Sequence, residues 1–186
     1  MLTRRIRKLQ LIFHRCISEF FLRHVMASCG SGLLIEKPLF INYEVLHVGD
    51  RFRVWPNARI EGVEEYFGQK FNPSIVVGNN FSVQQDFHCV ICNRLEIGDD
   101  VTISKNVTIL DNEHDYSAKN ALRGKLKVEP VIIEDSVFIG ANSTILAGTK
   151  IGRCVTIGAN SVVKGVLVDY GIYAGNPARK IESKNS

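Results

Sequence analysis

The chain has 186 residues, a formal net charge of +4 and 23% charged residues, which allows one domain with a substantial core. Much of the positive excess lies at the two ends, and so small a charge does not indicate a nucleic-acid partner. The five cysteines are odd in number and scattered, which predicts reduced thiols in a cytoplasmic protein rather than a disulfide framework.

Residues 1–30 form the first predicted region, a basic amphipathic helix over about residues 2–28. Apolar residues such as Ile6, Leu9 and Phe13 recur at three- and four-residue spacing, and basic residues crowd the start. Charges interrupt every window of about 20 residues that a bilayer span requires, and no convincing signal-peptide cleavage site follows. Two interpretations stay open: the helix packs on the coil end or another subunit, or it rests on an anionic inner membrane face.

Residues 31–170 are predicted to be a coil of short strands, because aliphatic residues stand six positions apart. The spacing begins faintly at Val48, Val54 and Ile60. It returns at Val77, Val83 and Cys89, slips by two residues, and resumes at Ile97, Ile103 and Ile109. It is strictest near the C-terminal end, at Ile133, Ile139, Ile145, Ile151, Ile157 and Val163.

Each six-residue unit is predicted to be one very short strand followed by a bend. Strands alternate their faces, so Val137 and Ile139 point one way and Phe138 the other. Gly140, Ala141 and Asn142 then suit a tight corner, and a helix would not tolerate Gly and Asn at each corner. Such strands bury an apolar side only by stacking, which indicates an all-β parallel β-helix. An ordinary sandwich would show turn signals every 8 to 12 residues or so.

Two stretches break the repeat and are predicted to leave the coil as surface excursions. Residues 61–74 form the first, with Tyr66 and Phe67 available for packing or for ligand contact. Residues 111–130 form the second, a polar loop with a basic run, and loops that leave a solenoid often carry function. The tail, residues 171–186, is expected to end the coil and fold back over it.

His114, at the start of the 111–130 loop, is the best-placed candidate for chemistry. Histidine side chains titrate near about pH 6.5 and can take a proton at neutral pH. The acidic neighbours Asp111, Glu113 and Asp115 can hold one ring nitrogen. From composition alone a solvated loop histidine is the alternative.

Cys89 and Cys92 form a lone CxxC with no second pair and no flanking histidine at zinc-finger spacing. Cysteines of the coil core are therefore favoured over a zinc site.

Four segments together resemble the hexapeptide-repeat acyltransferases: IGANSTI, IGANSVV, ILDNEHD and YAGNPARKI. The similarity covers about residues 75–182 and is strongest to the sugar O-acetyltransferases of the galactoside and maltose type and to related surface-polysaccharide acetyltransferases. It implies a left-handed parallel β-helix, a homotrimer, and acetyl-CoA bound between subunits as acyl donor, with no metal. The left hand does not follow from the spacing, because parallel crossovers are nearly always right-handed.

The resemblance also implies catalytic and acceptor residues. His114 matches the family's catalytic histidine, and Asp111 matches an acidic residue that often precedes it in the polysaccharide branch. Gln84 stands where the galactoside enzymes have an asparagine near the acceptor, so this substrate contact differs.

For the coenzyme, the matching positions are Gly140, Ala141, Ala159, Lys164 and Arg179. The first three lie where the backbone meets the pantetheine arm. Lys164 and Arg179 lie near the nucleotide end, where cationic side chains can pair with phosphates.

These features predict an O-acetyltransferase that moves an acetyl group from acetyl-CoA to a sugar hydroxyl in surface polysaccharide or glycoconjugate biosynthesis. A sugar-nucleotide N-acetyltransferase, which acts on an amine, is the leading alternative. A non-catalytic β-helix scaffold is a further one. A carbonic anhydrase on the same solenoid would need three zinc ligands, usually histidines, and only His88 and His114 are placed for that.

Overall fold

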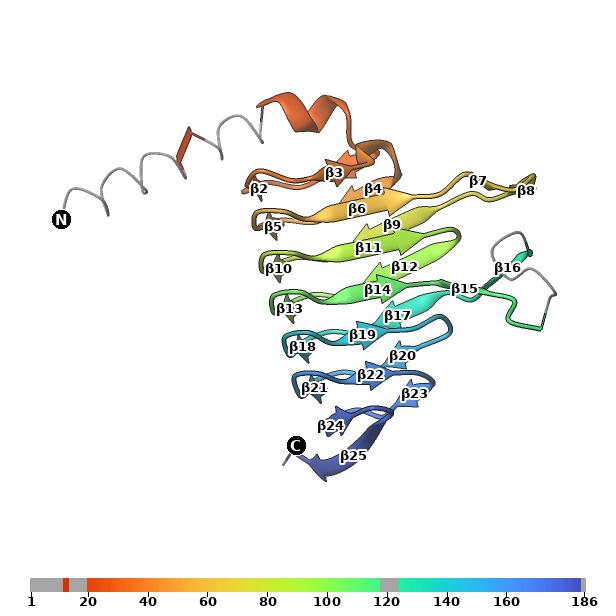
Figure 1. Ribbon diagram of the computed structural model, residues 1–186. Coiled ribbons are helices and arrows are strands. Elements are labelled where there is room, and N and C mark those ends of the chain that lie inside the picture. Colours follow the sequence, from red (N-terminus) through yellow and green to blue (C-terminus); the bar gives the residue numbers. More distant parts are fainter. Residues whose placement is uncertain (1–11, 14–19, 118–123, 185–186) are drawn as a thin grey trace.

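Short strands and tight corners alternate along the chain, and three strands complete one coil (Figure 1). The computed structural model describes residues 12–13, 20–117 and 124–184. Corresponding strands of successive coils pair in parallel, so the coils stack into three sheets, here named A, B and C in the order in which the chain visits them.

The strands of each sheet follow one another along the stack. Sheet A contains β1 (Ser28–Cys29), β4 (Leu46–Val48), β9 (Ser74–Val77), β12 (Arg94–Ile97), β17 (Val131–Ile133), β20 (Lys150–Ile151) and β23 (Val166–Leu167). Sheet B contains β2 (Leu34–Ile35), β5 (Arg53–Val54), β10 (Ser82–Val83), β13 (Thr102–Ile103), β18 (Phe138–Ile139), β21 (Thr156–Ile157), β24 (Gly171–Gly175) and β25 (Ala178–Ser183). Sheet C contains β3 (Phe40–Ile41), β6 (Arg59–Gly62), β11 (His88–Ile91), β14 (Thr108–Leu110), β19 (Thr144–Ile145) and β22 (Val162–Val163).

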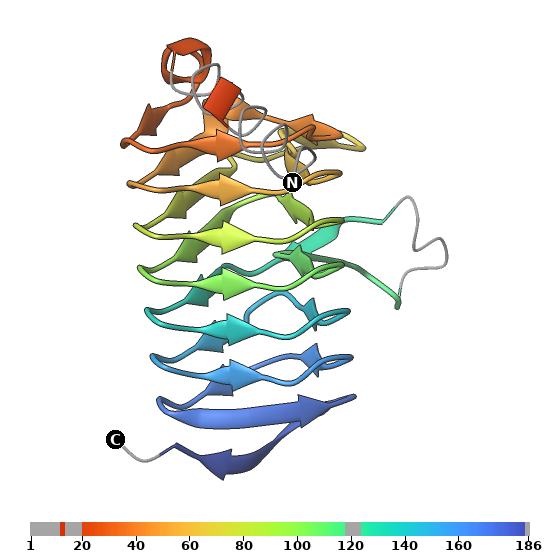
Figure 2. The ribbon, with the colours of Figure 1, turned by 90° about the vertical axis from the view of Figure 1, so that its left-hand side faces the viewer.

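The coil is left-handed, as the family resemblance implies. In Figure 1 the strands of sheet C run from left to right across the front while the chain descends from its N-terminal end. Figure 2 shows the strands of sheet B one above another, short along most of the stack and longer at the C-terminal end, where β24 and β25 lie. The fold class predicted from the sequence, an all-β left-handed parallel β-helix, is therefore confirmed.

The six-residue repeat forms the core. The aliphatic residues that define it are at most 1% exposed, namely Ile133, Ile139, Ile145, Ile151, Ile157 and Val163. Phe138, between two inward residues, points outward and is 44% exposed. Alternation within a strand and stacking between coils thus give one continuous apolar interior.

The corner between sheets A and B is held by a ladder of side-chain hydrogen bonds. At each step an Asp or Asn oxygen accepts the backbone N–H of a residue one coil earlier. The pairs are Asp50 with Ser31, Asn79 with Asp50, Asp99 with Asn79, Asp135 with Asp99, and Asp169 with Arg153. A Cβ on Gly98 would collide with the Asp135 carboxylate, so this corner needs glycine.

Two antiparallel hairpins leave the coil at the corner between sheets C and A. The first is β7 (Glu65–Tyr66) with β8 (Gln69–Lys70), and the second is β15 (Asn112–His114) with β16 (Leu126–Val128). They occupy the two stretches in which the sequence repeat is broken. Figure 1 shows both hairpins on the same side of the coil.

The ends of the coil differ from the expected boundaries. β1 begins at Ser28 and pairs with β4, so the coil starts before residue 31 and the segment 28–30 is not helical. β24 still belongs to sheet B, although it begins at residue 171, and β25 folds back antiparallel to it. Two 3-10 turns, η1 (Leu22–His24) and η2 (Tyr43–Val45), lie near the N-terminal end.

Most of the helix predicted for residues 2–28 lies outside the described residues. Among the residues that are described, no helix is long and apolar enough to cross a membrane.

Candidate active site

His114 is the last residue of β15 and stands outside the coil on the second hairpin. β15 pairs with β16 in antiparallel register, which places His114 opposite Leu126. The histidine is half-buried, and Leu126 is 8% exposed. A short hairpin rooted in a rigid coil thus presents the imidazole at the edge of the molecule.

Asp111 anchors the root of this hairpin. Its carboxylate accepts the backbone N–H groups of Cys92 at 2.8 Å, Asn93 at 2.6 Å and Arg94 at 3.0 Å, and the side chain is fully buried. The catalytic role of Asp111 stays a prediction; in the structure both its oxygens are turned into the corner between β11 and β12. Asp111 caps the backbone between β11 and β12, an arrangement typical of charge-assisted hydrogen bonds.

The two cysteines of the CxxC are buried, as the sequence predicts. Cys89 is 0% and Cys92 is 1% exposed, and both are free. Burial, together with the nearby Asp111 carboxylate, raises the pKa of Cys92 to about 12. Within the described part of the chain, no group of three His, Cys, Asp or Glu side chains is arranged to hold a metal ion.

The first hairpin contacts the second one at His114. The ring centroids of Tyr66 and His114 lie 5.7 Å apart in an edge-to-face arrangement. The Gln69 side chain bonds both backbone groups of Leu126: its Nε2 donates to the carbonyl at 3.2 Å, and its Oε1 accepts the N–H at 2.9 Å. The sequence did not predict a role for Gln69, because no motif distinguishes it from the other residues of the 61–74 excursion.

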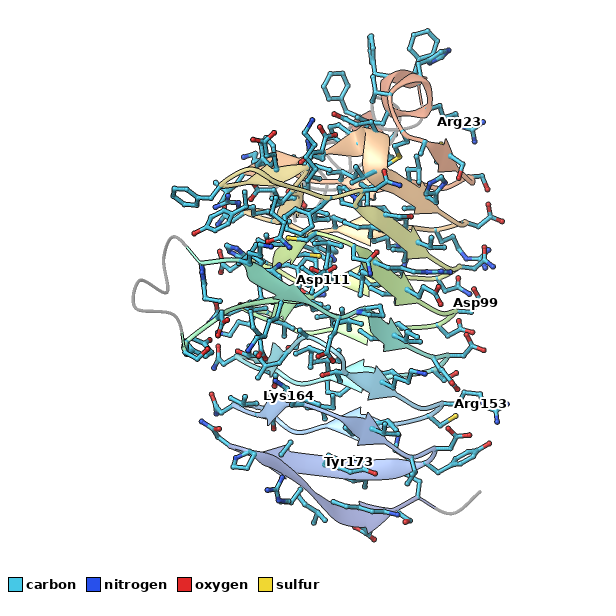
Figure 3. All side chains as sticks on the ribbon, turned by 90° about the vertical axis from the view of Figure 1, so that its right-hand side faces the viewer. Arg23, Asp99, Asp111, Arg153, Lys164 and Tyr173 are labelled. Carbon is cyan, nitrogen blue, oxygen red and sulfur yellow. The ribbon has the colours of Figure 1, made fainter. Side chains whose placement is uncertain are left out.

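The acidic neighbours of His114 form their own ion pairs. Lys164 Nζ donates to Glu113 at 2.6 Å, and this contact raises the pKa of Lys164. Asp115 accepts hydrogen bonds from Ser117 and pairs with Lys127 at 3.3 Å, which lowers the pKa of Asp115. Figure 3 shows Lys164 below Asp111, while Asp99 and Arg153 lie on the opposite edge of this view.

The residues expected to contact coenzyme and acceptor gather on a different edge, the corner between sheets B and C. Gln84 follows β10, Gly140 and Ala141 follow β18, and Ala159 lies in the corner after β21. Arg179 reaches this corner from β25, where it pairs with Ala174; the neighbouring Gly175 N–H donates to Ser161.

One chain does not bring these two groups of residues together. In Figure 1 the corner between sheets B and C lies at the left ends of the front strands, and the hairpin of His114 leaves from their right ends. The corner residues Ala141 and Ala147 lie at opposite ends of β19, so sheet C separates the two corners. Lys164 lies on the same edge as His114, the corner between sheets C and A. The second group lies at the corner between sheets B and C and consists of Gln84, Gly140, Ala141, Ala159 and Arg179.

Comparison with known proteins gives a family match in the strictest part of the repeat. Residues 130–165 match the model of the bacterial transferase hexapeptide (six repeats). A relative from Escherichia coli K12, the proposed lipopolysaccharide biosynthesis O-acetyl transferase WbbJ, is 29% identical over 162 residues. The match covers 82% of this chain and 79% of WbbJ.

Two solved structures share the fold over nearly the whole chain. A maltose O-acetyltransferase from Clostridium difficile 630 has a TM-score of 0.58 at 26% identity, covering 97% of this chain and 84% of its own. AntD, an N-acyltransferase from Bacillus cereus in complex with dTDP and 3-hydroxybutyryl-CoA, has a TM-score of 0.74 at 23% identity. The match covers 90% of this chain and 88% of the AntD chain.

Proposed function

We propose that this chain is a hexapeptide-repeat acyltransferase that transfers an acetyl group from acetyl-CoA to a hydroxyl group of a saccharide. The observation that carries the proposal is the placement of His114 on a hairpin anchored by Asp111 and contacted by Tyr66. The hydroxyl acceptor is favoured because WbbJ and the maltose enzyme are both named as O-acetyltransferases.

In the proposed reaction His114 acts as general base. Its imidazole removes the proton from the sugar hydroxyl while the oxygen attacks the thioester carbonyl. Backbone N–H groups stabilise the tetrahedral oxyanion. The carbon–sulfur bond then breaks, the acetyl ester remains on the sugar, and the imidazolium returns its proton to the departing coenzyme A thiolate.

A homotrimer completes the proposed site. Since His114 and the coenzyme positions lie on different edges of one chain, a neighbouring copy has to supply Gly140, Ala141, Ala159 and Arg179, with Gln84 near the acceptor. Cyclic symmetry then repeats the same contact around a threefold axis, so three equivalent sites form.

The two cations expected near the coenzyme phosphates differ in their availability. Arg179 is exposed at the C-terminal end of the coil. Lys164 is already paired with Glu113 and has to leave that partner to reach a phosphate. Arg179 is therefore the stronger candidate for phosphate binding, and Lys164 supports the His114 hairpin through Glu113.

A second candidate function is N-acyl transfer to an amino sugar carried by a nucleotide. It is suggested by the fold that this chain shares with AntD, which is named as an N-acyltransferase. The coil and a coenzyme A thioester donor suit both reactions, so the acceptor distinguishes them.

We also propose that the N-terminal segment contacts a membrane surface or another subunit. Phe20 and Phe21 are 71% and 63% exposed, and basic residues precede them in the sequence. This contact suits an acceptor that is a lipid-linked saccharide in polysaccharide biosynthesis.

The experiment that tests the function is thiol release from acetyl-CoA by the wild type and by His114→Ala, with a panel of sugar hydroxyls and amino-sugar nucleotides. We expect acceptor-dependent release that falls by about 10²- to 10⁴-fold in His114→Ala. His47→Ala is the matched control, since His47 lies on sheet A and bonds Ser28. Full activity of His114→Ala contradicts the mechanism. Release with amines alone identifies the second candidate, and absence of both release and coenzyme binding identifies a scaffold.

A further inference from the structure

The hairpin β7–β8 lies directly against the hairpin that carries His114, although the two are far apart in sequence. Both leave the coil at the corner between sheets C and A, β7–β8 before β9 and β15–β16 before β17. The intervening strands β9 to β14 form two coils, so the contact depends on the stacking of the coil rather than on local sequence.

Gln69 joins the backbones of the two hairpins. Its amide uses one donor and one acceptor on the two backbone groups of a single residue, Leu126. A cleft of about 410 Å³ lies beside this contact, lined by Gln69 and Lys70 of β8, by Leu126 and Val128 of β16, and by Asn93 from the corner between β11 and β12. These two hydrogen bonds connect the hairpins directly.

The contact at Leu126 bears directly on His114. Leu126 and His114 are register partners in β15–β16, so a shift of Leu126 moves the strand on which His114 lies. Tyr66, three residues before Gln69, places its ring edge-to-face with the imidazole. Phe67 in turn packs against Tyr66, with ring centroids 4.8 Å apart.

We propose that β7–β8 is the positioning element of the catalytic histidine: Gln69 fixes the place of the His114 hairpin, and Tyr66 fixes the plane of its ring. This inference rests on the proposed role of His114 as general base. Gln69 and Tyr66 are positioning residues, and neither takes part in the chemistry. Asp111 anchors the root of the same hairpin through the backbone of residues 92–94.

Loss of either contact should lower turnover without affecting the coenzyme. A displacement of about 1 Å at a reacting group can cost about 10²-fold in rate. We therefore expect kcat to fall by about 10- to 100-fold in Gln69→Ala and Tyr66→Leu, with an unchanged KM for acetyl-CoA.

Conservative variants separate positioning from other roles. Gln69→Glu keeps an acceptor for the Leu126 N–H but loses the donor to its carbonyl, so an intermediate kcat is expected. Tyr66→Phe keeps the ring and should retain near wild-type kcat. Lys70→Ala is the matched control, because Lys70 lines the same cleft and its loss should leave kcat unchanged.

The direct readout is the position of the His114 ring resonances in a ¹H–¹³C correlation spectrum of histidine-labelled protein. Tyr66→Leu removes the ring current of Tyr66 and should shift them, Tyr66→Phe should not, and Gln69→Ala should shift or broaden them. His114→Ala assigns the resonances by their disappearance.

The outcomes are decisive in both directions. Wild-type kcat and unshifted His114 resonances in Gln69→Ala and Tyr66→Leu overturn the inference. An equal loss of kcat in Tyr66→Phe and Tyr66→Leu also overturns it, since the hydroxyl would then take part directly. If the wild type has no turnover, or His114→Ala retains it, the proposed function fails, and the resonances still decide whether β7–β8 positions His114.

Discussion

Asp111 has a carboxylate with no exposed surface, and its two oxygens accept three backbone N–H groups. An asparagine offers one acceptor oxygen, and its amide N–H₂ would face backbone donors. We expect Asp111→Asn to lower the free energy of unfolding by about 1–3 kcal/mol, the cost of unsatisfied buried groups. Thermal or denaturant unfolding of both proteins measures this difference.

A catalytic Asp111 would give the opposite result. In that case Asp111→Asn would unfold like the wild type while losing as much kcat as His114→Ala. Ser117→Ala serves as the control, because the Ser117 hydroxyl bonds Asp115 on the exposed part of the same hairpin and should change stability little.

A short motif singles out His114 and Asp111 in the sequence, but it does not show that their surroundings differ. The motif shows that Asp111 is close in sequence, and only the fold shows that its carboxylate turns away into the corner at Cys92. Gln69 carries no motif at all. Its partner Leu126 is 57 residues away, and nothing local to either residue predicts the contact.

At the scale of the elements, the ladder between sheets A and B ties successive coils together from Ser31 to Asp135, and again from Arg153 to Asp169. Asp50 accepts both the backbone N–H and the hydroxyl of Ser31, and these bonds lower the pKa of the Asp50 carboxyl below its usual value of 3.8. Asn79 makes the equivalent backbone contact one coil later with an amide oxygen. Asp50→Asn therefore keeps the geometry and removes only the charge.

The stability change of Asp50→Asn should depend on pH. A carboxyl with a lowered folded-state pKa adds stability above its unfolded pKa, and this stability is lost as the pH falls through the folded value. We expect the variant to have a lower Tm than the wild type at pH 7. The difference should persist down to about pH 4 and close below it. A Tm difference that stays constant to pH 2 would contradict this charge effect.

The six-residue spacing was sufficient to predict the elements, because burial of every sixth aliphatic residue leaves few alternatives to stacked short strands. The spacing also predicted where the chain leaves the coil, at residues 61–74 and 111–130. It could not predict that both excursions are hairpins on one corner, since that depends on how many coils separate them. The repeat slips after Cys89 because the corner between β11 and β12 is longer, and Asp111 caps this corner.

At the scale of the whole molecule, the two groups of site residues lie on different edges of one coil. His114 and Lys164 lie at the corner between sheets C and A, and Ala141 and Ala159 lie at the corner between sheets B and C. The sequence predicts a corner at Gly140 and Ala141 and a loop that begins near His114, but the edge on which each lies follows only from the coiled structure. If each complete site lies between two copies, two variants that are inactive alone can restore activity when they assemble into one trimer. A site within one chain does not allow this.

Mixed trimers test this prediction. His114→Ala lacks the base, and Ala159→Trp places a large side chain at an exposed corner of the coenzyme edge, so each variant alone should be inactive. In trimers assembled from equal amounts of both, a site is intact when an Ala159→Trp copy presents His114 to a His114→Ala copy. Purification through two different tags leaves only trimers that contain both variants, and each of these has one such site in three, so about a third of wild-type activity should return.

The measurement is acceptor-dependent thiol release by co-expressed variants that carry two different affinity tags, purified through both tags in sequence. In the control, a single variant is co-expressed in two differently tagged forms. These trimers should stay inactive, which shows that the tags and the co-expression do not restore activity by themselves. If the site lay within one chain, every chain of the mixture would lack one component and no activity could return. Because the two edges of a coil are held apart by sheet C, restored activity would mean that His114 of one copy reaches the coenzyme edge of its neighbour.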